Sequence, residues 1–243
     1  MKSFIRRSLA LGSVLLGTLG VGIVGAGFVA NSAMALTQEQ VGSKLVALPA
    51  YIMVSGESPL LVSTSPDAGT EQSILYVFMT EGEADLFLAN ARENNPDFAA
   101  DARIEQANLQ ALYQESRNNT EQPLRLVFVP EREEAEQAAA ISEDYQRGVP
   151  LFAATFEDGS LVPVSQENGE TVVPMFFSRA DLESSLEQIA AVNPEAREAI
   201  NIGVYPLERL IAEMESSDDA QLDQIRLFPD SETVNSIIQS RGQ

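Results

Sequence analysis

Residues 176–182, with the sequence FFSRADL, decide the fold because residues 78–84, FMTEGEA, repeat their pattern 98 positions earlier. In both segments an apolar pair is followed by a hydroxyl residue and, three residues later, by an acidic residue. Thr80 and Ser178 are typical helix N-caps, since their side-chain oxygen accepts a hydrogen bond from a backbone N–H of the first turn. The pattern therefore predicts a strand that turns directly into a helix, twice in one chain.

These two segments belong to a longer duplication that runs through most of the chain. The same spacing aligns Leu88 with Leu186, Asn95-Pro96 with Asn193-Pro194, Ile104 with Ile202, and Leu109 with Leu207. A series of matches that keeps one order is the signature of an internal repeat. We therefore divide the chain into a first α+β repeat, residues 36–141, and a second α+β repeat, residues 142–243.

The sequence of each repeat predicts the same order of strands and helices. In the second repeat, two turns separate three short apolar runs, because Asp-Gly and Asn-Gly tolerate the positive φ of hairpin turns. The runs are Leu151–Phe156, Leu161–Val164 and Val172–Phe177. A helix follows and ends before a proline, since the residue before proline avoids the α region. The expected fold class is α+β, with two pseudo-symmetric repeats, each an antiparallel β-meander followed by helices and a further strand, forming a two-lobed molecule.

The first 35 residues have the pattern of a cleaved signal peptide. Basic residues precede a long apolar run, and Ala33 and Ala35 supply the small side chains of an A-x-A cleavage site. The apolar run is long enough to span a bilayer, so an uncleaved anchor stays open as an alternative. We expect residues 1–35 to be removed and the protein to be exported.

Composition excludes several chemistries. The chain contains no His, Cys or Trp, and its 36 acidic and 15 basic residues give a formal net charge of −21. Without His and Cys there is no Ser-His-Asp triad, no thiolate nucleophile and no imidazole or thiolate metal site. An acidic surface repels nucleic acid and anionic lipid headgroups. We therefore expect no catalytic residue, no cofactor, no metal, no nucleic-acid partner and at most peripheral membrane association.

Two segments resemble a known family. Residues 148–156, GVPLFAATF, lead into an Asp-Gly turn, and residues 173–182, VPMFFSRADL, follow. Together they resemble the GVPVF…G…P.FFS..D pattern of the twenty-two-kilodalton Tic component, a family of the chloroplast import machinery with cyanobacterial members. The resemblance implies a two-lobed, pseudo-symmetric fold and a soluble protein that handles other proteins between two membranes.

For a cyanobacterial member, which the bacterial-type signal fits, the resemblance implies the periplasm or the thylakoid lumen. It also implies a chaperone-like role in protein translocation and in outer-membrane protein biogenesis. The partners would be unfolded or precursor proteins, such as outer-membrane β-barrel precursors, and their assembly machinery. Such a factor needs apolar surface and like charge, but no nucleophile. The alternatives are a small-ligand binding protein with a pocket between the repeats, and a hydrolase that uses two carboxylates.

The candidate client-binding residues are large apolar side chains of the expected strands and of the first long helix. They are Met53, Phe78, Met79, Leu86, Phe152, Met175 and Phe177. Leu86 lies off the apolar stripe of its helix and corresponds to Ser184 in the second repeat, which predicts an exposed contact. For the other six, packing in the core is the competing interpretation, although methionine suits a surface that adapts to many partners.

Four glutamates that follow Pro130 form an acidic cluster, which could be either a metal site or a solvated helix face. Glu131, Glu133, Glu134 and Glu136 follow Pro130 at the start of an expected helix. Acidic side chains in the first turn complement the positive end of the helix dipole. Their spacing is not that of a calcium-binding loop, so a solvated face is expected there.

Overall fold

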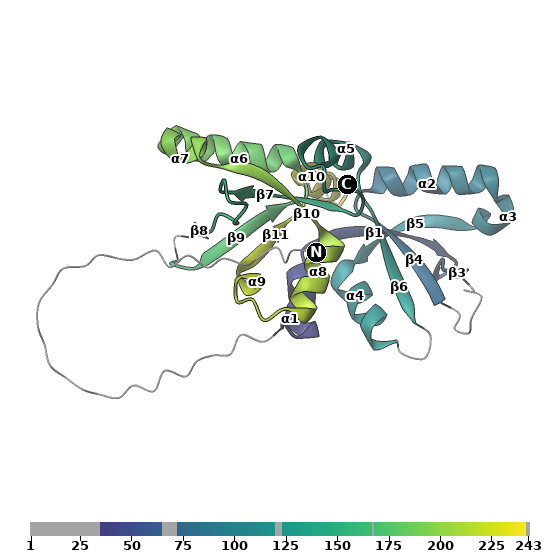
Figure 1. Ribbon diagram of the computed structural model, residues 1–243. Helices are drawn as coiled ribbons and strands as arrows, with labels where there is room; N and C mark the ends of the chain where they lie inside the picture. The colour runs from purple at the N-terminus through teal and green to yellow at the C-terminus, as the bar shows by residue number, and fades with distance from the viewer. Residues whose placement is uncertain (1–34, 65–71, 120–122, 167, 242–243) are drawn as a thin grey trace, which may run out of the picture.

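The computed structural model describes residues 35–241 except 65–71, 120–122 and 167, so the expected signal peptide lies outside the described residues apart from Ala35. The first repeat forms one sheet and the second repeat another, and they lie on either side of the centre in Figure 1. Two long helices, α2 and α6, extend from the centre in opposite directions. The expected α+β fold with two related halves is confirmed.

The elements of the two repeats follow the same order. The first contains α1 (Gln38–Leu45), β1 (Pro49–Ser55), β2 (Ser58–Pro59), β3 (Val62–Thr64), β4 (Gln72–Phe78), α2 (Glu81–Asn94), α3 (Pro96–Ala99), β5 (Ala102–Asn108), α4 (Leu109–Asn118), β6 (Leu124–Val129) and α5 (Arg132–Ile141). The second contains β7 (Pro150–Thr155), β8 (Val164–Ser165), β9 (Thr171–Phe176), α6 (Arg179–Val192), α7 (Pro194–Glu198), β10 (Asn201–Pro206), α8 (Leu207–Ser216), α9 (Gln221–Gln224), β11 (Ile225–Phe228) and α10 (Ser231–Arg241). The repeats differ in helix α1, because no described helix lies between α5 and β7. They also differ in β2 and in α9, which have no counterpart among the described elements of the other repeat.

The strand neighbours are also the same in both sheets. In the first, β5 pairs with β1, β1 with β4, and β4 with β6; in the second, β10 pairs with β7, β7 with β9, and β9 with β11. The β4–β6 and β9–β11 pairs are parallel and the others antiparallel. The middle run of the expected meander forms only β8 and one bridge, Thr155 with Leu161. Pro163 interrupts that run, since it has no N–H to donate to a ladder.

The two strand-to-helix junctions are built as the sequence predicts. The Thr80 hydroxyl accepts from the backbone N–H of Glu83 at 3.4 Å, and the Ser178 hydroxyl accepts from that of Asp181 at 3.4 Å. Both helices end at an asparagine that precedes proline, after which the chain makes a short second helix. Each junction therefore fixes the direction in which a long helix leaves its sheet.

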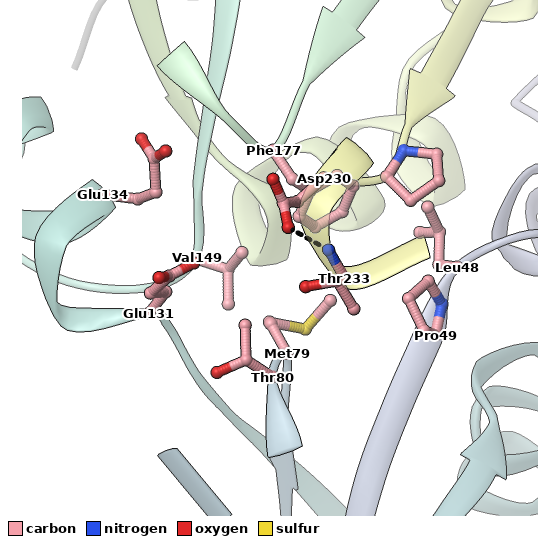
Figure 2. Close-up of a pocket in the computed structure, with 11 residues that line it drawn as sticks. Leu48, Pro49, Met79, Thr80, Glu131, Glu134, Val149, Phe177, Asp230 and Thr233 are labelled. Carbon is pink, nitrogen blue, oxygen red and sulfur yellow. Dashed lines mark hydrogen bonds between the residues drawn. The ribbon is translucent and has the colours of Figure 1, made fainter. Parts of the chain in front are cut away.

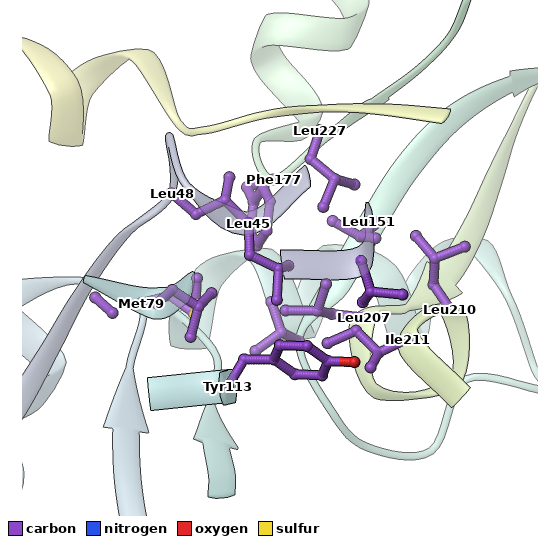
Figure 3. Packing of buried hydrophobic residues seen from close by; sticks show 14 of the residues in the cluster. Leu45, Leu48, Met79, Tyr113, Leu151, Phe177, Leu207, Leu210, Ile211 and Leu227 are labelled. Atoms are coloured by element: carbon purple, nitrogen blue, oxygen red, sulfur yellow. The ribbon is translucent and has the colours of Figure 1, made fainter. Parts of the chain in front are cut away.

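A single hydrophobic core joins the halves, and one smaller cluster lies under each long helix. The central core combines residues of α1, β1, β4 and α4 with residues of β7, β9, α8 and β11. In Figure 3, Leu45 and Tyr113 from the first repeat pack among Leu151, Leu207 and Ile211 from the second. Because both repeats bury apolar area in the same cluster, neither half has a complete core by itself.

Helix α5 crosses from the first repeat to the second, where it packs on β7 and β10. Side-chain caps then link neighbouring helices across the centre. Glu83 of α2 accepts from the N–H of Arg132 at 3.2 Å, Glu134 of α5 accepts from the N–H of Arg179 at 3.1 Å, and Asp181 of α6 accepts from the N–H of Ser231 at 2.9 Å. Each bond places a carboxylate at the positive end of the next helix. These links bring α2, α5, α6 and α10 together at the centre of Figure 1. No helix among the described residues combines the length and the apolar character needed to cross a bilayer.

Candidate functional site

Six of the seven predicted client-binding residues lie in the core. Met53, Phe78, Phe152 and Met175 are at most 1% exposed, Met79 is 8% exposed, and Phe177 is 7% exposed. The physical reason is that helices cover both faces of both sheets, so neither face of a central strand reaches solvent. A partner cannot contact these side chains on the folded surface. Leu86 is 51% exposed on α2, as the comparison with Ser184 predicts.

Met79 and Phe177 line a small pocket between the two repeats, which Figure 2 shows. Equivalent positions of the repeats contribute to it in pairs, namely Leu48 with Val149, Met79 with Phe177, and Glu131 with Asp230. The pocket therefore lies on the pseudo-two-fold axis. Its cavity volume is about 20 Å³, which is room for roughly one water. This pocket between the repeats is too small for a metabolite or a sugar ring.

The carboxylates around this pocket belong to the acidic cluster after Pro130. Burial and the nearby charge of Asp230 raise the pKa of Glu131 above its ordinary value. Burial also raises the pKa of Glu134, although the N–H of Arg179 stabilises its charged form. Among the described residues, no group of three or more acidic side chains is arranged to hold a metal ion. Glu133 and Glu136 therefore lie on a solvated face, as the sequence predicts, whereas Glu131 and Glu134 are partly buried. Glu134 also accepts from the N-terminus of α6.

Two larger open clefts lie elsewhere, along strand β6. Two adjoining clefts of about 530 Å³ and 820 Å³ share the residues Arg125, Leu126, Phe128 and Glu208. The first is walled by α4 and α8, and the second by α5 and the segment before β7. We call the two together the β6 groove. Because four consecutive residues of β6 line the second cleft, and side chains of a strand alternate between faces, the groove follows the edge of the strand.

One wall of the β6 groove holds the repeats together. The Tyr113 hydroxyl on α4 donates to Glu215 on α8 at 2.7 Å, and Arg117 makes two bonds to the same carboxylate, at 2.6 and 3.0 Å. Burial and the bond to Glu215 raise the pKa of Tyr113 to about 12. Charge-assisted bonds of this kind fix a wall rather than leave a mobile surface.

The β6 groove is also where unpaired positive charge gathers. Arg125, Arg132 and Arg147 line it, and within the described part of the chain their guanidinium groups form no hydrogen bond or ion pair. Every other basic side chain that the structure describes is bonded, namely Lys44, Arg92, Arg103, Arg117, Arg179, Arg197, Arg209 and Arg226. Glu208, whose pKa burial raises, is held at the groove floor by the N–H of Val149 at 3.1 Å.

Sequence reasoning missed the β6 groove. Its arginines are spread over three elements, and no spacing links Arg125, Arg132 and Arg147 before the chain is folded. One signal was available, because the duplication gives the segment before β7 no apolar pattern to match residues 38–45. The missing helix leaves the space that the groove occupies.

The model of the Tic22-like family matches residues 19–240. Two solved structures are similar in fold. Anabaena Tic22, a protein of protein transport, is 23% identical, with a TM-score of 0.69, over 84% of this chain and 97% of that chain. Tic22 from Plasmodium falciparum is 16% identical, with a TM-score of 0.60, over 84% of this chain and 98% of that chain. None of the curated proteins compared with the sequence matches it.

Proposed function

Because the chain belongs to the Tic22-like family, we propose that it acts in protein transport by binding unfolded segments of other polypeptides, and that it catalyses no reaction. The family predicted from the patterns at residues 148–156 and 173–182 is confirmed by that match. Protein transport is the role given for Anabaena Tic22. What this chain binds is inferred from its own surface.

The observation that carries the proposal is the β6 groove. It is open, it has apolar side chains such as Leu126 and Phe128 in its floor, and it follows the edge of a strand. Apolar surface at a strand edge is a template for another chain, and soluble proteins normally cover it. A net charge of −21 keeps the protein itself dispersed while this surface stays open.

The location and the clients are part of the same proposal. A signal pattern in residues 1–35 supports export, to the periplasm or the thylakoid lumen of a cyanobacterium. In either compartment, an exported factor would meet precursor proteins that have crossed the membrane unfolded. Outer-membrane β-barrel precursors are clients of this kind, because their strands stay unpaired until the barrel closes.

A dilution assay tests the proposal. A β-barrel precursor unfolded in urea is diluted into buffer, with and without the purified protein, and its aggregation is followed by light scattering. We expect the protein to delay aggregation and to co-elute with the precursor in gel filtration. An unchanged scattering curve at large molar excess of the protein, together with no co-elution, contradicts the proposal.

Leu86 is the remaining candidate contact from the sequence, and it is tested in the same assay. Leu86→Glu should reduce binding, because it places a charge in an exposed apolar contact. Ser184→Glu, at the equivalent exposed position of α6, is the matched control and should leave binding unchanged. Both variants should keep the far-ultraviolet circular dichroism of the wild type, since both positions are exposed.

A further inference from the structure

We propose that the β6 groove binds its client as an extended, acidic segment that adds one strand to the edge of β6. This inference rests on the proposed function and specifies its site, the conformation of the bound segment and its charge. Three features of the molecule support it: the backbone groups of β6 that point outward, the helix that covers the equivalent edge in the second repeat, and the position of the unpaired cations.

The backbone of β6 presents unpaired groups along the groove. The carbonyls of Pro123 and Val129 accept from the N–H groups of Ser73 and Met79 at 3.2 Å, so these carbonyls point towards β4. Backbone direction alternates along a strand, and in a parallel pair each residue directs its N–H and C=O to the same side. The outward groups are therefore those of Leu124, Leu126 and Phe128. Within the described residues they form no hydrogen bond, and β6 has β4 as its one partner strand.

The equivalent edge of the second repeat is covered. Helix α1 packs against α4, α8 and β11, and the Lys44 ammonium donates to the carbonyls of Asp223 at 2.7 Å and of Ile225 at 3.1 Å. Ile225 is the repeat equivalent of Leu126. A partly buried amine thus caps in β11 the same outward carbonyl that β6 leaves open. The contrast indicates that β6 needs a partner and that this chain does not supply one.

The charge of the groove indicates the chemistry of that partner. Arg125, Arg132 and Arg147 form no ion pair within the described chain, although acidic residues outnumber basic ones by more than two to one. Arg147 acts on the Glu208 carboxylate through its charge alone, without a direct bond. An exposed guanidinium group can donate two parallel hydrogen bonds to one carboxylate. A strand laid along β6 extends about 3.3 Å per residue, so acidic side chains at alternate positions of a short segment could reach several of these arginines. The geometry therefore favours an extended segment rich in Asp and Glu.

If a strand is added to β6, protection of the backbone amides from exchange should change at every second residue of β6. The probe is a synthetic peptide of alternating Glu and Val residues, and amide hydrogen exchange is measured residue by residue by NMR with and without it. On binding, exchange at Leu124, Leu126 and Phe128 should slow, while Arg125, Val127 and Val129, already bonded to β4, should not change. If the peptide binds and the three outward amides exchange as before, strand addition is overturned. Uniform slowing of both sets also overturns it, and indicates a helix or a loop lying over the groove.

Charge substitution tests the acidic character of the segment. The triple variant Arg125→Gln, Arg132→Gln, Arg147→Gln should weaken peptide binding by about tenfold or more. A matched triple variant, Arg103→Gln, Arg179→Gln, Arg226→Gln, changes the net charge equally outside the groove and should stay within about twofold of the wild type. The same peptide with Lys in place of Glu should not bind. Equal losses in the two triple variants would show that net charge, rather than the groove, attracts the peptide.

The two proposals fail in distinguishable ways. If the precursor assay shows client binding but the amide and charge tests give the contrary results, the site and mode inferred here are wrong and the proposed function stands. If no unfolded polypeptide binds in any assay, the proposed function fails and the strand-addition inference falls with it.

Discussion

The two repeats end their sheets in different ways. In the second, α1 lies against β11, and Lys44 caps its outward carbonyl. In the first, β6 faces a groove and its outward groups have no partner among the described residues. The repeats share one fold, and the difference at this edge accompanies helix α1, which has no described counterpart before β7. A duplicated chain can thus cover one sheet edge and leave the equivalent edge open.

The last helices of the two repeats, α5 and α10, differ in the same direction. Helix α10 presents Val234 and Ile238 to a cleft of about 460 Å³, whereas α5 presents Ala135 and Ala139 to a cleft of about 820 Å³ at the equivalent place. Larger side chains fill the first space and small ones leave the second open. The β6 groove is thus wide for two reasons, a missing helix and a helix with small side chains.

The largest effect is expected from breaking the covered edge. Leu45 is 1% exposed and belongs to the central core, so Leu45→Ala should cost about 3 kcal/mol of unfolding free energy through lost burial and a cavity. Urea denaturation followed by circular dichroism measures this. Val46→Ala, one residue on and half exposed, is the control and should cost less than about 0.5 kcal/mol. Equal costs would show that α1 does not hold the second edge closed.

The second effect concerns the bend that replaces a helix before β7. Gly148 has a φ of +97°, and an added Cβ would lie 2.5 Å from Glu208 Oε2. Gly148→Ala should therefore cost about 2 kcal/mol, from backbone strain and from displacing the carboxylate that accepts from Val149. Gly159→Ala is the control, because Gly159 also has positive φ but open space around its Cβ, and it should cost about 1 kcal/mol. If Gly148→Ala lowers the unfolding free energy no more than Gly159→Ala does, then displacement of Glu208 does not contribute to the loss.

Local chemistry made part of this fold predictable. The apolar pair followed by Thr80 or Ser178 determines a strand, a cap and a helix within a few residues, and the structure contains all three in each repeat. The Asn-Pro pairs end both long helices for an equally local reason. The duplication then predicts that the second half follows the order of the first.

Long-range pairing made the rest unpredictable. Strand Leu124–Val129 reads as an apolar run, but nothing in its sequence says that it is an edge strand or which side stays open. The burial of Met53, Phe78 and Phe152 depends on how helices pack on the sheets. The sequence predicts where these helices lie along the chain but not which face of a sheet they cover. Only Leu86 could be assigned correctly to the surface, because the sister helix has a serine there.

A smaller effect is expected at the axis, where the two repeats meet. Burial raises the pKa of Glu131 in the folded protein, so its proton is held more tightly there than in the unfolded chain. Its contribution to stability is therefore present at low pH and is lost as the pH rises through the raised pKa. Glu131→Gln should stabilise the protein slightly at neutral pH and flatten the fall in stability between acidic and neutral pH. Glu133→Gln, an exposed change in the same turn, should flatten that fall less, because it removes one nearby charge that raises the pKa of Glu131 but leaves the burial of that carboxyl in place.

The smallest change in stability should separate the groove from the fold. Ala135→Val with Ala139→Ile gives α5 the side chains that α10 carries at the equivalent positions, and both alanines face the open cleft. Because no core contact is removed, the unfolding free energy should change by less than about 0.5 kcal/mol. Binding of the Glu-Val peptide should fall several-fold, since the added methyl groups occupy the space beside β6. The reciprocal pair, Val234→Ala with Ile238→Ala, should leave binding unchanged, because the β11 edge stays covered by α1. If the reciprocal pair creates a second peptide-binding site, then small side chains on the last helix of a repeat are enough to expose a sheet edge. The absence of a covering helix would then not be the cause.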